Sequence, residues 1–117
     1  MTQLITSKIN KTDDVDRYSE LEKKCDSGFE IQVLHEIKKR GYRLPDEAQK
    51  VIHEGDEPIT IADFFYNPNV SVFVDGPDHE KDYVKHADTR KRNRIKSLGY
   101  RVLLIKSIDD VIQVKDF

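Results

Sequence analysis

Residues 59–79 read ITIADFFYNPNVSVFVDGPDH, and the rest of the chain is organised around this stretch. Two runs rich in β-branched and aromatic residues flank Asn-Pro-Asn at 67–69, which is strong turn chemistry. The stretch is therefore predicted to form two neighbouring strands joined by a tight turn. Asp63 lies inside the first strand, Asp75 stands at the end of the second, and His79 follows just beyond a Gly-Pro break.

The acids of this stretch stand among apolar residues. The alternation Ile59, Ile61, Asp63, Phe65 puts a carboxylate on the same strand face as three apolar side chains. A carboxylate in that position is costly unless a proton, a cation or a metal pairs with it. Acids at neighbouring strand ends with an imidazole beside them suggest a site for a hard cation, magnesium or manganese, suited to phosphate chemistry.

Phosphodiester cleavage assigns a role to each of these groups. The reaction needs a nucleophilic water and compensation of charge at the phosphate, and a magnesium ion held by one or two carboxylates supplies both. Asp63 and Asp75 are the candidate carboxylates. His79, because an unperturbed imidazole has a pKa of about 6.5, is the candidate acid or base. Asp88, early in the next predicted helix, is a candidate to orient His79 or to support the site from further out.

Structural alternatives stay open for these residues. Asp75 followed by glycine is a common signal for the end of a strand, and Asp63 can be a satisfied structural acid. A lone histidine such as His79 is usually a surface or capping residue. The remaining histidines are assigned to that class outright; they are His35, His53 and His86.

Size and composition fit one small domain. The chain has 117 residues, of which 37% are hydrophobic and 36% charged, so there is room for a single core. Cys25 is the only cysteine, which excludes an intrachain disulfide and a cysteine-based zinc cluster. No signal-peptide core and no apolar run near the ~20 residues of a membrane span is visible. A cytoplasmic location and no membrane partner are therefore expected.

Spacing of apolar residues predicts the remaining elements. Ser27 and Glu30 form a capping box at the start of a helix that runs to residue 40 and stops at Gly41. Residues 1–26 are predicted to be an N-terminal tail with a lead-in helix, and 27–117 the main domain. Further along the chain we expect a strand near 48–52, a turn over 53–58, the two strands above, a helix ending near 98, a strand over 100–105 and a short helix capped by Ser107. This order predicts an α/β layer structure with a mixed sheet flanked by helices.

Glu30 has two possible roles. As a capping residue, it accepts a hydrogen bond from the Ser27 amide. As an acid on the first core helix, it projects toward the strand acids. Both roles can hold together, because a helix N-terminus favours a nearby carboxylate.

The net charge of −2 hides a basic segment between residues 81 and 106. Most charge runs are only the solvated face of a helix. Here the run directly follows the acidic stretch, so it can also bind a phosphate backbone. Contacts of this kind give an affinity for nucleic acid that depends on salt and not on base sequence. The candidate contacts to nucleic acid are Arg90, Lys91, Arg92, Arg94 and Lys96.

Taken together, these residues resemble a known nuclease superfamily. The pattern is Glu30 on a first helix, DFF at 63–65, VFVDG at 72–76, His79, and DTR at 88–90 leading to LGYRVL at 98–103. It is similar to the PD-(D/E)XK restriction-endonuclease-like superfamily, and within it to the branch of the very short patch repair endonucleases. The resemblance covers about residues 27–106 and implies an αβββαβ core and a magnesium-dependent DNA endonuclease.

The resemblance also implies which residues act. Asp75 stands where the superfamily usually has a lysine, a position that this branch fills with histidine or aspartate. Phe73 replaces a carboxylate common in the superfamily; the repair branch lacks it too and binds metal through a backbone carbonyl, here that of Val74. The cysteine-rich zinc site of the repair enzymes is not visible. The remaining positions that match acids or the histidine of the family are Glu30, Asp63, His79 and Asp88.

Three functions remain open at this point. The first is a DNA endonuclease, nicking or double-strand, that uses magnesium or manganese. The second is a catalytically degenerate DNA-binding module attached to a helicase, motivated by the missing lysine and by Phe73. The phrase GYRLPDEAQ at 41–49, followed by DFFY and FVDG, resembles a domain at the C-terminal end of large helicase-like proteins, which implies a helicase domain in the same or a partner chain. The third is a purely structural interaction domain.

Overall fold

The computed structural model describes residues 16–75 and 82–117, and the side chains of the second segment from residue 88 onward. Its strands form one mixed sheet in the order β1-β2-β3-β4. The strand β1 (Glu47–Glu54) pairs antiparallel with β2 (Glu57–Tyr66), and β2 pairs antiparallel with β3 (Val70–Val74). The strand β4 (Arg101–Ile105) runs parallel to β3. The helix α3 (Asp82–Ser97) provides the crossover that a parallel pair requires. The predicted α/β fold with a mixed sheet is confirmed.

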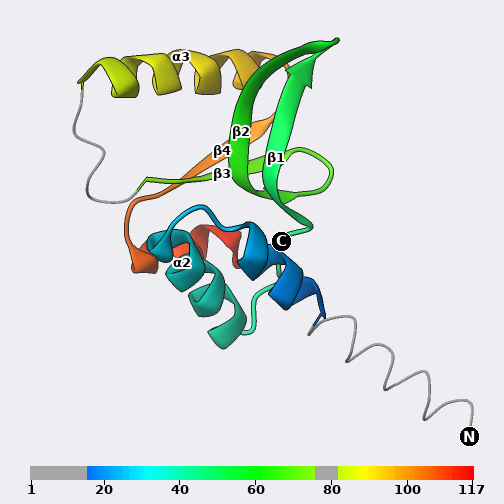
Figure 1. Ribbon diagram of the computed structural model, residues 1–117, viewed down its shortest axis with the longest axis vertical. Coiled ribbons are helices and arrows are strands. Elements are labelled where there is room, and N and C mark those ends of the chain that lie inside the picture. The colour runs from blue at the N-terminus through cyan, green and yellow to red at the C-terminus, as the bar shows by residue number, and fades with distance from the viewer. Residues whose placement is uncertain (1–15, 76–81) are drawn as a thin grey trace, which may run out of the picture.

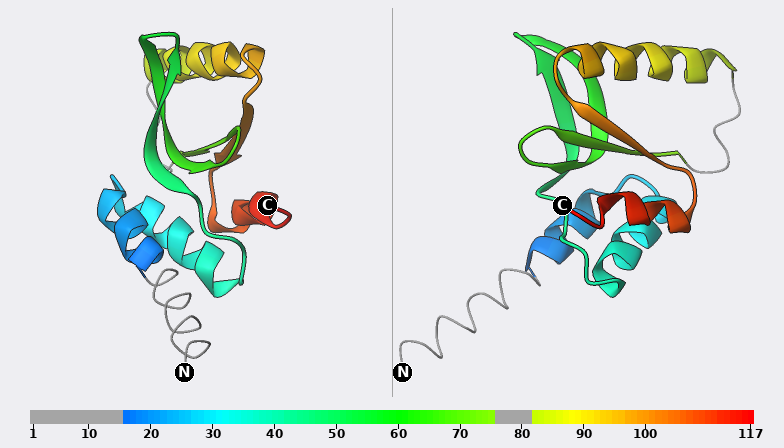
Figure 2. Two further views of the ribbon diagram at one scale, coloured as in Figure 1. Left: turned by 90° about the vertical axis from the view of Figure 1, so that its right-hand side faces the viewer. Right: turned by 180° about the vertical axis from the view of Figure 1, so that it is seen from behind.

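Helices cover both faces of the sheet, as Figure 1 and Figure 2 show. The helix α3 lies on one side of the sheet. The other side is covered by a helix over residues 16–24, the helix α2 (Gly28–Lys39) and the 3-10 helix η1 (Ile108–Val114). The larger hydrophobic cluster joins α2 and η1 to the sheet through Val33, Leu34, Ile37, Phe64, Val72, Val111 and Val114, among others. The smaller cluster joins Ile95 of α3 to Ile52, Ile59, Ala62, Phe65 and Phe73.

The helix over residues 16–24 contributes to the larger cluster. Its Leu21 is 3% exposed, and Tyr18 and Cys25 pack against the same core. The boundary between residues 26 and 27 stays a prediction. Within the part of the chain that the structure describes, no helix combines the length and the apolar character needed to cross a bilayer.

The predicted capping box at the start of α2 is present with one changed partner. The Ser27 hydroxyl accepts the N–H of Glu30 at 3.2 Å. The Glu30 carboxylate accepts the N–H of Asp26 at 3.1 Å and the hydroxyl of Ser27 at 3.2 Å, rather than the Ser27 amide. At the other end of α2, Gly41 takes a φ of +75°, the left-handed conformation that ends helices.

Two details of the β1–β2 hairpin differ from the sequence prediction. Residues 53–58, predicted as a turn, mostly continue the two strands, and the reversal is confined to Gly55 and Asp56. Ile61 is 51% exposed, so Asp63 does not share a buried face with three apolar residues. The physical reason is that Ile59 and Ala62, three positions apart, both pack in the cluster that contains Ile95 of α3, so that burial along this part of β2 does not follow a period of two.

Candidate functional site

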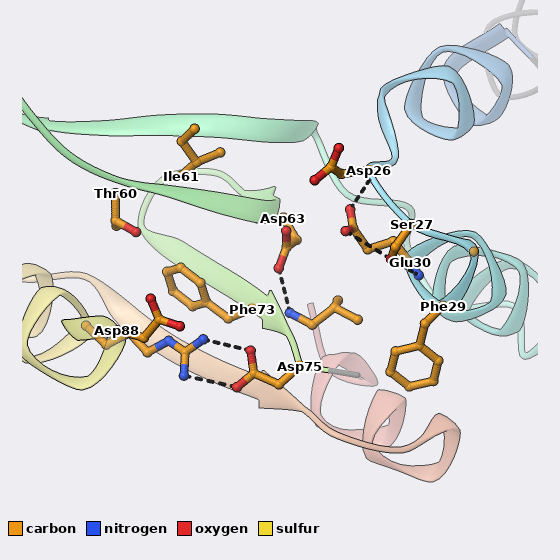
Figure 3. Close-up of a pocket in the computed structure, with 13 residues that line it drawn as sticks. Asp26, Ser27, Phe29, Glu30, Thr60, Ile61, Asp63, Phe73, Asp75 and Asp88 are labelled. Atoms are coloured by element: carbon orange, nitrogen blue, oxygen red, sulfur yellow. Dashed lines mark hydrogen bonds and ion pairs between the residues drawn. The ribbon is translucent and has the colours of Figure 1, made fainter. Parts of the chain in front are cut away.

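An open cavity of about 520 Å³ lies where the start of α2 meets β2, the end of β3 and α3 (Figure 3). Glu30 reaches it from α2, Asp63 from β2, Asp75 from the residue after β3, and Asp88 from α3. The structure therefore brings together four of the five residues that the sequence proposed as catalytic. The fifth, His79, lies outside the described residues.

Glu30 and Asp63 are linked through Gln49 of β1, a residue that the sequence analysis did not select. The Gln49 side-chain amide donates to Glu30 Oε1 at 2.8 Å and to Asp63 Oδ1 at 3.5 Å. The other oxygen of Asp63 accepts the N–H of Val74 at 2.7 Å, drawn as a dashed line in Figure 3. Across residues 16–75 and 88–117, neither carboxylate takes part in an ion pair. The partners of both acids there are neutral.

Burial raises the pKa of both carboxyl groups. For Glu30, burial is the largest cause; the Asp26 amide opposes it, and the charge of Asp63 adds to it. For Asp63, burial is again the largest cause, opposed by the Val74 N–H and the Gln49 amide, and the charge of Asp75 raises the pKa further. Groups that have lost solvation next to like charges gain most from an added cation.

The donor set of the cavity fits a hard divalent cation. Carboxylate oxygens are the ligands that magnesium prefers, and it usually takes only one or two of them and keeps several waters. No group of three or more His, Cys, Asp or Glu side chains among the described residues is already arranged to enclose an ion. An ion held by one or two carboxylates and its own waters does not require a group of that size.

Asp75 differs from its neighbours because it has a cationic partner. The guanidinium of Arg92 donates to both oxygens of Asp75, at 2.8 and 3.0 Å, and lies 4.7 Å from the centre of the Phe73 ring. The side chains of Arg92 and Asp75 are only 15% and 22% exposed, respectively. The Nε atom of Arg92 is buried and has no hydrogen-bond partner among the residues that the structure describes. Arg92 was predicted to contact phosphate; in the structure it neutralises an acid of the cavity.

The other basic residues of α3 divide into two groups. Arg94 pairs with Glu54 at 2.7 Å and with Glu57 at 3.3 Å, which ties the helix to the β1–β2 hairpin. Arg90, Lys91 and Lys96 are exposed and take part in none of the ion pairs found among the described side chains. These three residues, named the basic face, are spread around the solvent-exposed side of α3 and are available to a phosphate backbone.

Comparison with protein-family models, curated proteins and solved structures finds no match to this chain. The resemblance to the PD-(D/E)XK superfamily therefore stays a prediction that rests on the residues themselves. The proposed role of the Val74 carbonyl also stays a prediction; the contact described for Val74 at the site is the one made by its N–H.

The pair formed by Arg92 and Asp75 should contribute measurably to stability. We expect Arg92→Ala to lower the free energy of unfolding by about 2 kcal/mol, because two charge-assisted hydrogen bonds are lost and Asp75 is left uncompensated among other acids. Urea denaturation of Arg92→Ala, Asp75→Asn and the double variant measures the coupling between them.

The control for this prediction is Arg94→Ala, whose ion pairs lie among exposed side chains. Its effect on the free energy of unfolding should be much smaller than that of Arg92→Ala, because exposed ion pairs contribute little to stability. Purely additive effects of Arg92→Ala and Asp75→Asn would contradict the expected coupling.

Proposed function

We propose that this protein is a DNA endonuclease that depends on magnesium or manganese, of the PD-(D/E)XK type and similar to the very short patch repair branch. One observation carries the proposal. Glu30 and Asp63 are held side by side by neutral donors, without an ion pair among the described residues, in a cavity that Asp75 and Asp88 also line. Such a group of acids is stabilised by a bound cation.

The order of the elements supports the same proposal. The series α2, β1, β2, β3, α3, β4 follows the αβββαβ order that the resemblance implies. It also puts Asp63 on β2 and Asp75 at the end of the adjacent β3, so that both reach one cavity. The pairing of β2 with β3 thus brings together acids that are distant along the chain.

The proposed roles follow from these positions. Asp63, Asp75 and the Val74 carbonyl would hold the ion, which when bound supplies a nucleophilic water and compensates charge at the phosphate. The Val74 N–H fixes one oxygen of Asp63 and leaves the other toward Gln49. Glu30 and Asp88 support the site, and His79 is the proposed acid or base.

The basic face supports DNA as the substrate. Arg90, Lys91 and Lys96 belong to α3, the same helix that brings Asp88 and Arg92 to the cavity. A phosphate backbone bound along this helix therefore lies close to the acids. Contacts of this kind hold the duplex without reading its sequence.

The proposal is tested on supercoiled plasmid DNA with the wild-type protein. In Mg²⁺ or Mn²⁺ we expect conversion to the open-circular form, and in EDTA none, because the acids of the cavity then lack the ion that activates water. Gel electrophoresis of a time course measures the conversion. Absence of cleavage under every divalent metal would overturn the endonuclease proposal.

A second function is favoured by the contact between Arg92 and Asp75. An arginine that already neutralises Asp75, together with Phe73 in place of a carboxylate, suits a catalytically degenerate DNA-binding module serving a helicase in the same or a partner chain. If the protein has that second function, it should still bind DNA in EDTA, with a steep dependence of affinity on salt, and no divalent metal should produce cleavage. The plasmid assay therefore separates the two functions.

A further inference from the structure

Gln49 has a backbone conformation that is unusual for its residue type. Its φ is +54°, and no other non-glycine residue among those the structure describes has a positive φ. A residue with a Cβ is strained in this left-handed region. The pairs Ala48–Phe64 and Lys50–Ala62 flank it, so the register puts Gln49 opposite Asp63 on β2. A strained residue inside a strand is a reason to look for a role of its side chain.

The side chain of Gln49 lies between two acids. Its one amide nitrogen donates to both Glu30 and Asp63, from elements that are far apart in the sequence. Because one amide nitrogen reaches both carboxylates, the two acids lie close together, and they repel each other when both are ionised. A donor between them offsets this repulsion.

We infer that Gln49 is a positioning residue, whose amide holds Glu30 and Asp63 at a fixed separation for an incoming divalent cation. This inference rests on the proposed function of the cavity. A lysine or arginine in the same place would neutralise the acids and compete with the ion. An apolar residue would let them move apart. A neutral amide holds both carboxylates and leaves their negative charge to the metal.

Binding of Mn²⁺ to the wild-type protein and to two variants tests this role. Gln49→Met keeps the length of the side chain and removes the donor. Gln49→Asn keeps the amide but is one methylene shorter, so it cannot span both acids, while asparagine tolerates a positive φ better than glutamine. We expect each variant to bind Mn²⁺ roughly tenfold more weakly, as for other residues that orient metal ligands. Electron paramagnetic resonance of free Mn²⁺ measures the affinity.

Thermal stability distinguishes a positioning role of Gln49 from a purely structural one. Gln49→Asn should melt near the wild-type temperature in EDTA, because the relief of the backbone offsets the weakened hydrogen bonds, and should still lose Mn²⁺ affinity. In cleavage assays its kcat should fall while the KM for DNA stays unchanged. The matched control is Gln113→Met, which also removes two hydrogen bonds of a glutamine amide but lies outside the cavity.

The outcomes are distinct for the two proposals. If the wild type and both variants bind Mn²⁺ equally well, Gln49 is not a positioning residue, and the proposed function stands. If Gln113→Met weakens Mn²⁺ as strongly as the Gln49 variants, the inference is also overturned. If the wild-type protein binds no Mn²⁺ and cleaves no DNA, both the inference and the proposed function fail.

Discussion

Replacing Asp63 by asparagine is expected to lower plasmid nicking on the order of 10³-fold while raising the thermal stability of the metal-free protein. Asparagine keeps the shape of the side chain and still accepts the N–H of Val74 through its carbonyl oxygen. It removes the negative charge that the proposal assigns to the metal. Nicking rates in Mg²⁺ and melting curves in EDTA measure the two effects.

The gain in stability follows from the raised pKa of Asp63. Because burial raises this pKa above its ordinary value of 3.8, the folded protein binds the proton more tightly than the unfolded chain does. The resulting stability is fully present below the pKa of the unfolded chain and is lost as the pH rises through the pKa of the folded state. The melting temperature of Asp63→Asn relative to wild type should therefore increase from pH 4 to pH 7.

Metal binding provides the complementary readout. Added Mg²⁺ should raise the melting temperature of the wild type, because a ligand of the folded state stabilises it, and should raise that of Asp63→Asn far less. The control is Asp56→Asn, in the exposed turn of the β1–β2 hairpin, which should retain wild-type nicking. Undiminished cleavage by Asp63→Asn would remove Asp63 from the proposed site.

Most of the fold follows from signals that are local in the sequence. The capping residue Ser27 and the glycines Gly41 and Gly99, both with positive φ, mark helix ends through their own backbone chemistry. Residues 53–58 were misjudged because the outer part of a hairpin is exposed on both faces. Its polar residues then show no alternation, and they resemble a turn.

The candidate site depends more on contacts between distant residues. That Asp63 and Asp75 reach one cavity could be predicted from the pairing of two consecutive strands. The role of Arg92 could not be predicted from the sequence. No local pattern shows which of several basic residues in one helix turns inward to an acid 17 positions away. Gln49 carried no signal either, since a left-handed conformation is marked in a sequence only by glycine or asparagine.

The basic face of α3 should account for much of the affinity for DNA. We expect the triple variant Arg90→Ala, Lys91→Ala, Lys96→Ala to bind a DNA duplex roughly 10- to 100-fold more weakly near 0.1 M salt. The slope of log K against log salt should become shallower by about 0.9 for each lost phosphate contact, close to 3 in total. Fluorescence anisotropy of a labelled duplex in EDTA, at several salt concentrations, measures both quantities without cleavage.

A second triple variant controls for net charge. Lys23→Ala, Lys24→Ala, Lys39→Ala removes the same charge from exposed positions on the helices that cover the opposite face of the sheet. If only total charge mattered, both variants would lose affinity equally, and the basic face would not be the binding surface. Phosphate contacts act within about a Debye length, roughly 10 Å at 0.1 M salt. The control should therefore keep nearly the wild-type slope, because its lysines lie across the sheet from α3.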